Sequence, residues 1–154
     1  MSEPDQELFN LAMSDESRPL LYAVNKHIEE NVAPITDEFF ALNEEKEDRW
    51  TWHPRQMELL DGAKAKAKKS GLWNFFLPDA ETGEGLNNLD YAYIASELGK
   101  FSLASETLNC SAPDTGNMEV LERVGTPEQK EKWLEPLLNG EIRSAYAMTE
   151  PGVA

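Results

Sequence analysis

The sequence predicts an all-α protein: a bundle of helices followed by one strand near the C-terminus. Apolar residues recur at steps of three and four along most of the chain, which is the period of an amphipathic helix. Prolines, capping residues and glycines separate these stripes at the positions where helices begin and end. The segment after Glu141 loses the helical period. We therefore expect a helical domain over residues 1–141, and the first strand and turn of a second, truncated domain over residues 142–154.

The first third of the chain predicts three helices. An apolar stripe runs from Leu20 to Ile35, and Pro34 must kink or end that helix. The acidic stretch from Asp37 to Trp52 contains large apolar side chains, which indicates a short second helix and then a loop. Pro54 can occupy the first turn of a third helix, and Gly71 can end it.

The middle of the chain predicts a buried connection and two more helical segments. The run from Leu72 to Pro78 is mostly apolar and precedes a glycine-rich stretch, so we expect a buried extended segment and then a loop. Asn87 or Asn88 can cap the next helix, which Gly99 ends. The residues from Ser102 to Cys110 indicate a further helical segment.

The last helices carry the clearest local signals. An apolar stripe follows Pro113 and stops at Gly125. The run Thr126–Gln129 then supplies a capping hydroxyl, a proline at the first helical position and a capping-box glutamine. Gly140 closes this last helix, and the pattern from Ile142 to Met148 indicates a strand.

That strand has no predicted partner. A strand needs hydrogen-bonding neighbours for its backbone groups, and the other segments of the chain are expected to be helical. From the residues alone, we expect the chain to be part of a longer polypeptide.

Composition narrows the functional classes. The chain has 154 residues and a net charge of −15, with 29 acidic residues against 14 lysines and arginines. Such an acidic surface repels phosphates, which argues against a nucleic-acid partner. No apolar run is long enough for a membrane span, and the acidic N-terminus does not resemble a targeting peptide. Cys110 is the only cysteine, which fits a reducing compartment, and we expect a cytoplasmic protein.

Three consecutive segments carry a family resemblance. They are Gly125–Lys130, with the sequence GTPEQK; Trp133–Glu141, with WLEPLLNGE; and Ala145–Gly152, with AYAMTEPG. In this order and spacing they resemble the acyl-CoA dehydrogenase family. Upstream, the Asn109–Asn117 segment (NCSAPDTGN) fits the same family, and the resemblance extends over about residues 20–154.

The resemblance implies a fold and an activity. The family fold has an N-terminal helical domain, a middle β-domain and a C-terminal four-helix bundle, and this chain resembles the first part plus the opening strand of the second. The implied enzyme is an FAD-dependent oxidoreductase of fatty-acid β-oxidation. It removes two hydrogens from carbons two and three of an acyl-CoA thioester. The implied partners are the acyl-CoA substrate, an acceptor similar to electron-transfer flavoprotein, and further copies of the full-length chain in a homo-oligomer.

The resemblance also assigns cofactor contacts. Matched position by position, flavin contacts fall on Tyr146, Met148 and Thr149. The Thr149 hydroxyl and nearby backbone N–H groups are expected to donate hydrogen bonds to the pyrimidine edge of the isoalloxazine ring. Reduced flavin accumulates negative charge there, which fixed donors stabilise. The alternative is that Thr149 is an ordinary strand-end residue whose hydroxyl is satisfied within a turn.

Substrate contacts are expected on the helix after Pro113. In the family this helix lines the acyl-chain pocket, which places Asn117, Met118 and Leu121 near the acyl tail. The alternative for these three residues is plain core packing, which their helical spacing also supports.

No residue of this chain inherits the catalytic role. In the family the base is a glutamate of the C-terminal domain, so we read Glu150 as a turn or salt-bridge residue. Cys110 has no neighbouring base and is read as a small buried residue. His27 and His53 are far apart and form no metal pattern. We expect the isolated chain to be inactive. Two alternatives remain: a free-standing helical protein-interaction module, and an oxidase of the acyl-CoA or nitroalkane type with the same fold.

Overall fold

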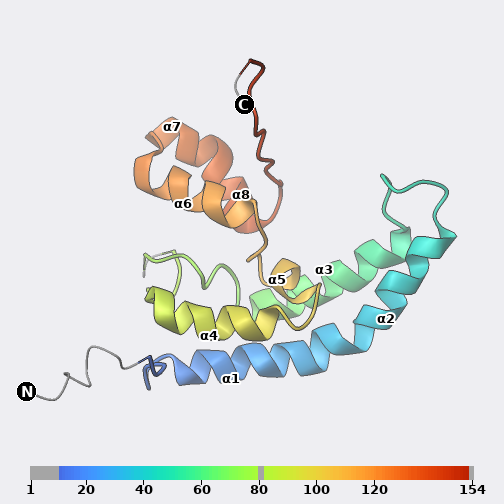
Figure 1. Ribbon diagram of the computed structural model, residues 1–154, viewed down its shortest axis with the longest axis horizontal. Coiled ribbons are helices and arrows are strands. Elements are labelled where there is room, and N and C mark those ends of the chain that lie inside the picture. The colour runs from blue at the N-terminus through green and yellow to red at the C-terminus, as the bar shows by residue number, and fades with distance from the viewer. Residues whose placement is uncertain (1–10, 80–81, 153–154) are drawn as a thin grey trace, which may run out of the picture.

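The computed structural model describes residues 11–79 and 82–152, and the elements found there are helical (Figure 1). The helices of the first two thirds of the chain lie together in one layer, the last helices form a second layer above it, and a short helix lies between the two (Figure 1). The elements are α1 (Arg18–His27), the π-helical turn η2 (Ile28–Val32), α2 (Ala33–Ala41), the 3₁₀ turn η3 (Leu42–Glu45), α3 (Pro54–Lys69), α4 (Asn88–Leu98), α5 (Ala104–Thr107), α6 (Asp114–Val124), α7 (Pro127–Gln129), the π-helical turn η4 (Lys130–Leu134) and α8 (Glu135–Asn139). The predicted helical class is confirmed.

Pro34 kinks the first helix and does not end it. The backbone N–H of Ala33 donates to the carbonyl of Ile28, five residues earlier, which is the bond of a π turn. This wider turn places Pro34 in the first turn of α2, where a residue without an N–H is tolerated. Figure 1 shows α2 rising away from the direction of α1. The same arrangement recurs at η4, which directly precedes the turn that contains Pro136.

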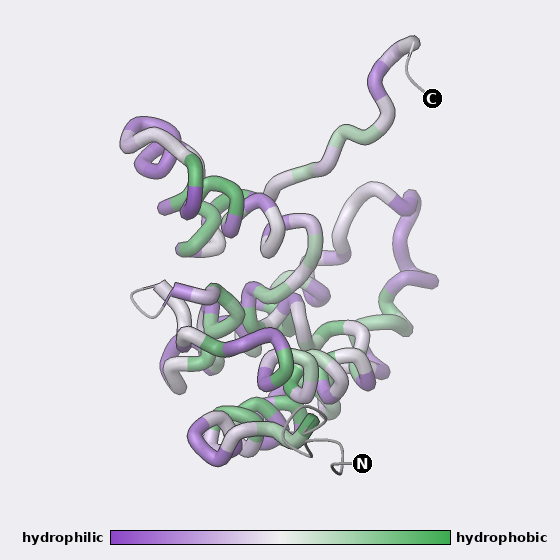
Figure 2. The backbone as a smooth tube through the Cα atoms, turned by 60° about the vertical axis from the view of Figure 1, so that its left-hand side comes forward, coloured by the Kyte–Doolittle hydropathy of each residue, from purple (hydrophilic) through white to green (hydrophobic). Residues whose placement is uncertain are grey.

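The core is one cluster to which both groups of helices and the segment from Leu72 to Leu77 contribute, and hydrophobic and hydrophilic positions alternate along the backbone (Figure 2). It includes the following fully buried side chains: Val24, Val32, Phe75, Leu77, Ile94, Leu108 and Met118. The segment from Leu72 to Leu77 is buried, as predicted, but it is not extended. It turns on itself, and the N–H of Leu77 donates to the carbonyl of Asn74 at 3.1 Å.

The buried segment also joins the two layers through polar side chains. The last carbonyls of a helix have no partner within the helix. In α8 these carbonyls accept from side chains of the layer below. Trp73 Nε1 and Asn74 Nδ2 donate to the carbonyl of Leu138 at 2.6 and 2.8 Å, and Asn109 Nδ2 donates to that of Leu137 at 3.0 Å. These bonds fix where the chain leaves α8.

A buried carboxylate fastens the N-terminal segment to α4. Asp90 is 3% exposed, and its Oδ1 accepts from the Ser14 backbone N–H at 2.8 Å. Its Oδ2 accepts from the hydroxyls of Ser14 and Ser17 and from Asn87 Nδ2, at 2.7, 2.9 and 2.8 Å. We call this set the N-terminal anchor. It holds Met13, 6% exposed, against the core.

The strand expected over Ile142 to Met148 is not formed in the part of the chain that the structure describes. A strand requires a neighbour with which to exchange backbone hydrogen bonds, and the described neighbours of this segment are helices and loops. The assignment of residues 142–154 to a second domain stays a prediction.

Candidate functional site

The C-terminal tail, residues 142–152, leaves the helical layers directly after α8. Gly140 has a φ of +70°, and a Cβ at this position would lie 2.8 Å from Cζ2 of Trp73, so the close approach requires glycine. The N–H of Glu141 then donates to the carbonyl of Pro136 at 2.9 Å. Figures 1 and 2 both show the tail projecting away from the helices. The direction of the tail is therefore set by the contacts that follow Glu141.

Asp114, the first residue of α6, makes the principal contacts with the tail. Its side chain is buried, at 2% exposure. Its Oδ1 accepts from the Ser144 backbone N–H at 2.7 Å and from the Ser144 hydroxyl at 2.5 Å, and its Oδ2 accepts from Arg143 Nε at 2.6 Å. Asn117 Nδ2 donates to the Ser144 hydroxyl oxygen at 2.8 Å. We call Asp114, Asn117, Arg143 and Ser144 the tail anchor.

Glu106 of α5 extends the anchor to the lower layer. Its Oε1 accepts from Arg143 Nη1 at 2.5 Å and from Lys64 Nζ of α3 at 2.6 Å. Both Glu106 and Lys64 are about four-fifths buried. Charges thus alternate from Lys64 through Glu106 and Arg143 to Asp114, and one network joins α3, α5, α6 and the tail.

The anchor is ionised at neutral pH. Burial raises the pKa of Asp114, but the hydrogen bonds from Ser144 and Arg143 lower it further, and the net pKa lies below the ordinary value. Burial lowers the pKa of Arg143, while the charges of Glu106 and Asp114 raise it, and the net pKa is raised. A buried carboxylate with a cationic partner and filled acceptor sites is the arrangement in which burial of charge is tolerated.

The three residues predicted to contact flavin lie beyond the anchor, on the exposed part of the tail. Tyr146 is 72% exposed and Met148 is 81% exposed. Thr149 is also exposed and has a φ of +51°, which is uncommon for a β-branched residue. The structure places these residues on one short segment and forms no pocket from them within the described chain. Their cofactor role stays a prediction.

The residues predicted to contact the acyl tail have three different environments. Asn117 is half-buried and belongs to the tail anchor. Met118 is fully buried in the core, and its sulfur lies 4.0 Å from Asn109 Nδ2. Leu121 is half-buried and packs against the core. All three lie on α6, but Met118 is a packing residue here, and a substrate role for the set stays a prediction.

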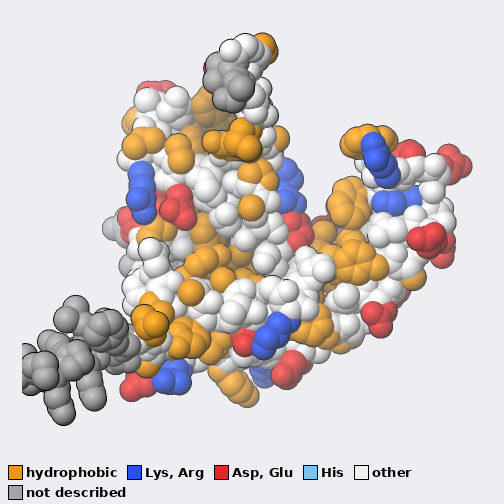
Figure 3. Space-filling view, in the orientation of Figure 1, with side chains coloured by type: hydrophobic (Ala, Val, Ile, Leu, Met, Phe, Trp, Pro, Cys, Tyr) orange, Lys and Arg blue, Asp and Glu red, His pale blue; other side chains and the backbone are white. Residues whose placement is uncertain are grey.

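An open cleft of about 610 Å³ lies beside the anchor. Figure 3 shows a hollow between the projecting end of α2 and α3 and the rest of the molecule, with hydrophobic side chains along its floor. Its apolar lining includes Phe39, Phe40, Trp52, Met57 and Leu103, and its polar lining includes Lys64, Glu106 and Arg143. Arg143 is thus the one member of the tail anchor that lines this cleft, beside Glu106 and Lys64.

The remaining candidate groups fit structural roles. Cys110 is 7% exposed, and burial raises the pKa of its thiol, which disfavours the reactive thiolate. No cluster of metal-ligating side chains occurs in the described ranges. None of the helices over the described residues has the length and hydrophobicity to cross a membrane.

Sequence reasoning missed Asp114, Arg143, Ser144 and Glu106. Their contacts span 29 to 37 positions along the chain, so no local pattern pairs them. One partial signal was present: Asp114 follows Pro113 at the start of a helix, where an acidic residue is favoured by the helix dipole. That signal predicts the helix start and says nothing about a partner.

Comparison with known proteins identifies the family. Residues 14–141 match the family model described as "Acyl-CoA dehydrogenase, N-terminal domain". Acyl-CoA dehydrogenase family member 10 of Mus musculus is 46% identical over 147 residues, which cover 92% of this chain and 13% of the mouse protein. Family member 11 of Gallus gallus is 46% identical over 144 residues, covering 92% of this chain and 18% of that protein.

A solved structure from Mycobacterium abscessus, assigned as an acyl-CoA dehydrogenase, shares the fold. It matches with a TM-score of 0.81 and 46% identity over 93% of this chain and 36% of that chain. The chain therefore spans about a third or less of the length of each of these three relatives. With its helical architecture and its match to the N-terminal domain, this chain belongs to the acyl-CoA dehydrogenase family.

Proposed function

We propose that this chain is the N-terminal helical domain of an FAD-dependent acyl-CoA dehydrogenase. Residues 1–141 form that domain, and residues 142–154 begin the β-domain. The observation that supports the proposal best is the tail. It is fixed to the helices at Ser144, and its next residues, Tyr146 and Met148, are exposed where a cofactor or a second domain can reach them.

The exposed tail residues fit the flavin of FAD by their chemistry. Thr149 offers a hydroxyl donor, Tyr146 a flat ring and Met148 a polarisable thioether, and the described structure uses none of the three in its core. When bound, FAD supplies the hydride acceptor for the oxidation of the acyl-CoA. The residues of this chain would hold and orient the ring, and the Thr149 hydroxyl would stabilise charge on it.

The proton-abstracting base is assigned to no residue of this chain. We therefore expect the isolated chain to catalyse no acyl-CoA oxidation. A missing general base alone lowers a rate by about 10²–10⁴-fold, and an incomplete cofactor site removes the reaction. In the complete enzyme, a separate acceptor protein would take up the electrons removed from the substrate.

The test uses the polypeptide encoded by the whole reading frame that contains this chain. We expect the purified protein to carry flavin, seen as visible absorbance, and an acyl-CoA substrate to bleach that absorbance. Thr149→Val, which removes the hydroxyl and keeps the shape, should slow bleaching about 10- to 100-fold, because a hydrogen bond to a charged group contributes about 1.5–3 kcal/mol.

The matched control is Thr51→Val. Thr51 is an exposed threonine whose hydroxyl contacts Asp48, in the loop between η3 and α3. This variant should bleach at the wild-type rate. A protein that purifies without flavin and takes none up from solution would contradict the proposal and favour the interaction-module alternative. A Thr149→Val variant as fast as Thr51→Val would remove Thr149 from the flavin site.

A further inference from the structure

We propose that Asp114 and Arg143 are positioning residues, which fix the point and direction at which the flavin-facing residues leave the helical domain. This inference rests on the proposed function, because that function makes the tail residues face flavin. The hydrogen bonds of the tail anchor supply the geometry. Neither residue contacts Tyr146, Met148 or Thr149 in the hydrogen bonds described above. Asp114 holds the tail backbone at Ser144, and Arg143, itself a tail residue, binds Asp114 and Glu106 through its side chain and so fixes the tail one residue earlier.

The tail anchor binds the backbone of the tail as well as a side chain. Asp114 Oδ1 accepts the Ser144 backbone N–H, while Oδ2 of the same carboxylate accepts Arg143 Nε. Two consecutive tail residues thus bind two oxygens of one rigid carboxylate. The tail can neither slide by one residue nor rotate about Ser144 without breaking a charge-assisted bond, and such bonds are about twice as strong as neutral ones.

Asp114 cannot move independently of the core. It is the first residue of α6, and Met118, one turn later on the same helix, is fully buried. On the other side, Arg143 is held by Glu106, which Lys64 of α3 also binds. The anchor is therefore a rigid reference point that connects both helical layers to the tail.

The flavin-facing residues lie only a short length of chain beyond the anchor. An extended chain spans at most about 3.4 Å per residue. Tyr146 therefore lies within about 7 Å of Ser144, and Thr149 within about 17 Å, whatever the conformation between them. A contact this close to a fixed point is strongly restricted in position.

Loss of the anchor would move the last fixed point back to Glu141, whose N–H donates to Pro136. The free chain before Tyr146 would grow from two residues to five. The effective concentration of a tethered group falls roughly as the −3/2 power of tether length, which predicts about a fourfold fall at Tyr146 and about a twofold fall at Thr149. The anchor thus has its largest effect on the residues nearest to it.

The N-terminal anchor supplies a control of the same chemistry. Asp90 is as deeply buried as Asp114 and also accepts one backbone N–H and serine hydroxyls, but its partners are Ser14, Ser17 and Asn87, and none of them belongs to the tail. A variant at Asp90 should disturb the fold in a similar way and leave the tail untouched. Asp114→Asn and Asp90→Asn therefore form a matched pair.

The first measurement is hydrogen exchange of the tail amides in this chain, which needs no flavin. In the wild type, the Ser144 amide should exchange about tenfold or more slowly than the amides of residues 146–150, because it donates to a carboxylate. Asp114→Asn should remove most of this protection, and Asp90→Asn should not. Arg143→Gln, at a half-exposed side chain that tolerates substitution, should lower the protection, and Arg143→Lys should restore part of it.

The second measurement is flavin binding by the protein encoded by the whole reading frame. Asp114→Asn and Arg143→Gln should raise the flavin dissociation constant about twofold to fourfold, with Asp90→Asn unchanged. Unaltered Ser144 exchange in both Asp114→Asn and Arg143→Gln would overturn the positioning role, even in a protein that binds flavin. If Asp114→Asn does not fold, Arg143→Gln alone decides. A wild type without flavin but with the predicted exchange pattern would instead contradict the proposed function and leave the anchor established.

Discussion

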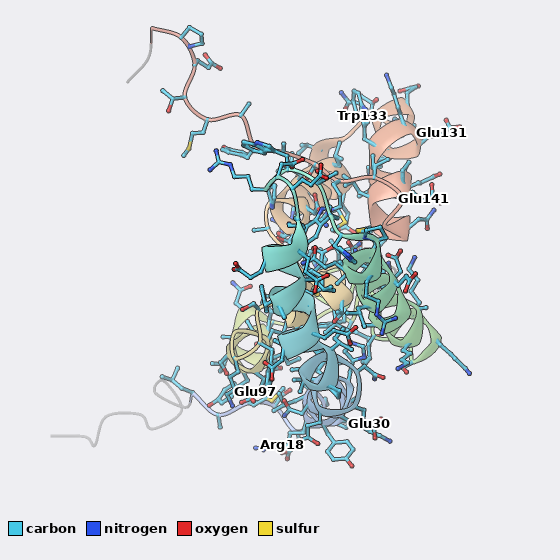
Figure 4. All side chains as sticks on the ribbon, turned by 90° about the vertical axis from the view of Figure 1, so that its right-hand side faces the viewer. Arg18, Glu30, Glu97, Glu131, Trp133 and Glu141 are labelled. Carbon is cyan, nitrogen blue, oxygen red and sulfur yellow. The ribbon has the colours of Figure 1, made fainter. Side chains whose placement is uncertain are left out.

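The N-terminal anchor and the tail anchor each use a buried carboxylate to hold a segment near one end of the chain, but the two segments continue differently. Each carboxylate lies near the start of a helix, Asp90 in α4 and Asp114 in α6. Figure 4 shows Arg18, next to the N-terminal anchor, in the lower part of the molecule and Glu141, just before the tail anchor, in the upper part. At the first anchor the chain continues into α1 against the core, and at the second it leaves the core.

The difference lies in the donors. Among the described residues, the donors to Asp90 are neutral: a backbone N–H, two serine hydroxyls and the amide of Asn87. Asp114 binds the cation of Arg143 as well, and Glu106 continues the charge network to Lys64. Neutral hydrogen bonds are enough to hold residues 14–17, because burial of apolar side chains beside them also stabilises that segment. The tail has no buried side chains, so its position depends on the ion pairs of Arg143 with Asp114 and Glu106.

The largest expected effect comes from removing the carboxylate itself. Asp114→Ala should lower the free energy of unfolding by roughly 1–3 kcal/mol, the usual result when a buried group loses its hydrogen-bond partner. Urea denaturation followed by circular dichroism measures this. Asp90→Ala should also destabilise the fold, but only Asp114→Ala should change the mobility of the tail. Equal tail mobility in the two variants would contradict the conclusion that Asp114, and not Asp90, fixes the tail.

The next effect is the loss of both anchors in acid. The Ser14 bonds lower the pKa of Asp90, and at Asp114 the Ser144 and Arg143 bonds outweigh burial and also lower the pKa. A carboxylate with a folded pKa below its unfolded value of 3.8 stabilises the fold above that pH, and this contribution is lost as the pH falls through the folded pKa. The amide resonances of Ser14 and Ser144 should therefore titrate below pH 3.8.

His27 produces a separate pH effect that must be distinguished from acid release. Burial, and then the charge of Lys66, lower the pKa of His27 below 6.5. The unfolded chain therefore takes up a proton first, and stability declines as the pH falls below 6.5. The Ser14 and Ser144 amide resonances could instead change with the protonation of His27, at a higher pH than that of the carboxylates. That result would show that loss of core stability, and not protonation of Asp90 and Asp114, releases the anchors.

The smallest expected effect is the response to salt. Arg143 is 51% exposed, so added salt screens its attraction to Asp114, and the screening length falls from about 10 Å at 0.1 M to about 3 Å at 1 M. The change should be below about 1 kcal/mol, as for other partly exposed ion pairs. Exchange of the Ser144 amide should accelerate with salt while that of Ser14 stays constant. A parallel response of both amides would show that the charge on Arg143 does not distinguish the anchors.

The helices could be predicted from the sequence because their ends are local. Asn87 caps α4 by accepting from the Asp90 N–H, and Thr126 and Gln129 form the predicted capping box. Pro54 begins α3 as predicted, and Gly71, with a φ of +72°, follows its end. In each case the signal lies within a few residues of the structure that it predicts.

Two features of the fold differ from what the sequence pattern predicts. The spacing of Trp133, Leu134, Leu137 and Leu138 predicts that these four residues form the buried face of the last helix, but Trp133 is 41% exposed, with Lys132 over its ring. The apolar segment after Gly71 is buried as predicted, but its turns follow from Asn74 and Asn109, which bind each other across 35 positions. Such a bond forms only when the chain has folded and brought the two residues together, so no local sequence pattern indicates it.

The candidate site was predicted from its motif and not from its geometry. The resemblance pointed to Tyr146, Met148 and Thr149, which the structure places together on the exposed tail. The carboxylate that holds this tail belongs to a different helix, and its pairing with Arg143 has no sequence signature. Motif similarity points to the segment proposed to bind flavin, whereas the residues that hold that segment in place can be recognised only in the three-dimensional structure.

The π turns before Pro34 and Pro136 have a consequence for how this chain tolerates length changes. A π turn contains one residue more than the α-helical turn it replaces, and one residue corresponds to about 100° of rotation. Deleting a single residue within η2 would therefore restore a regular helical turn and keep Phe39 and Leu42, both buried, in register, whereas deleting one residue of α2 ahead of Phe39 would rotate both away from the core by about 100°. The number of residues in this segment, as much as their hydrophobicity, decides which side chains of α2 reach the interior.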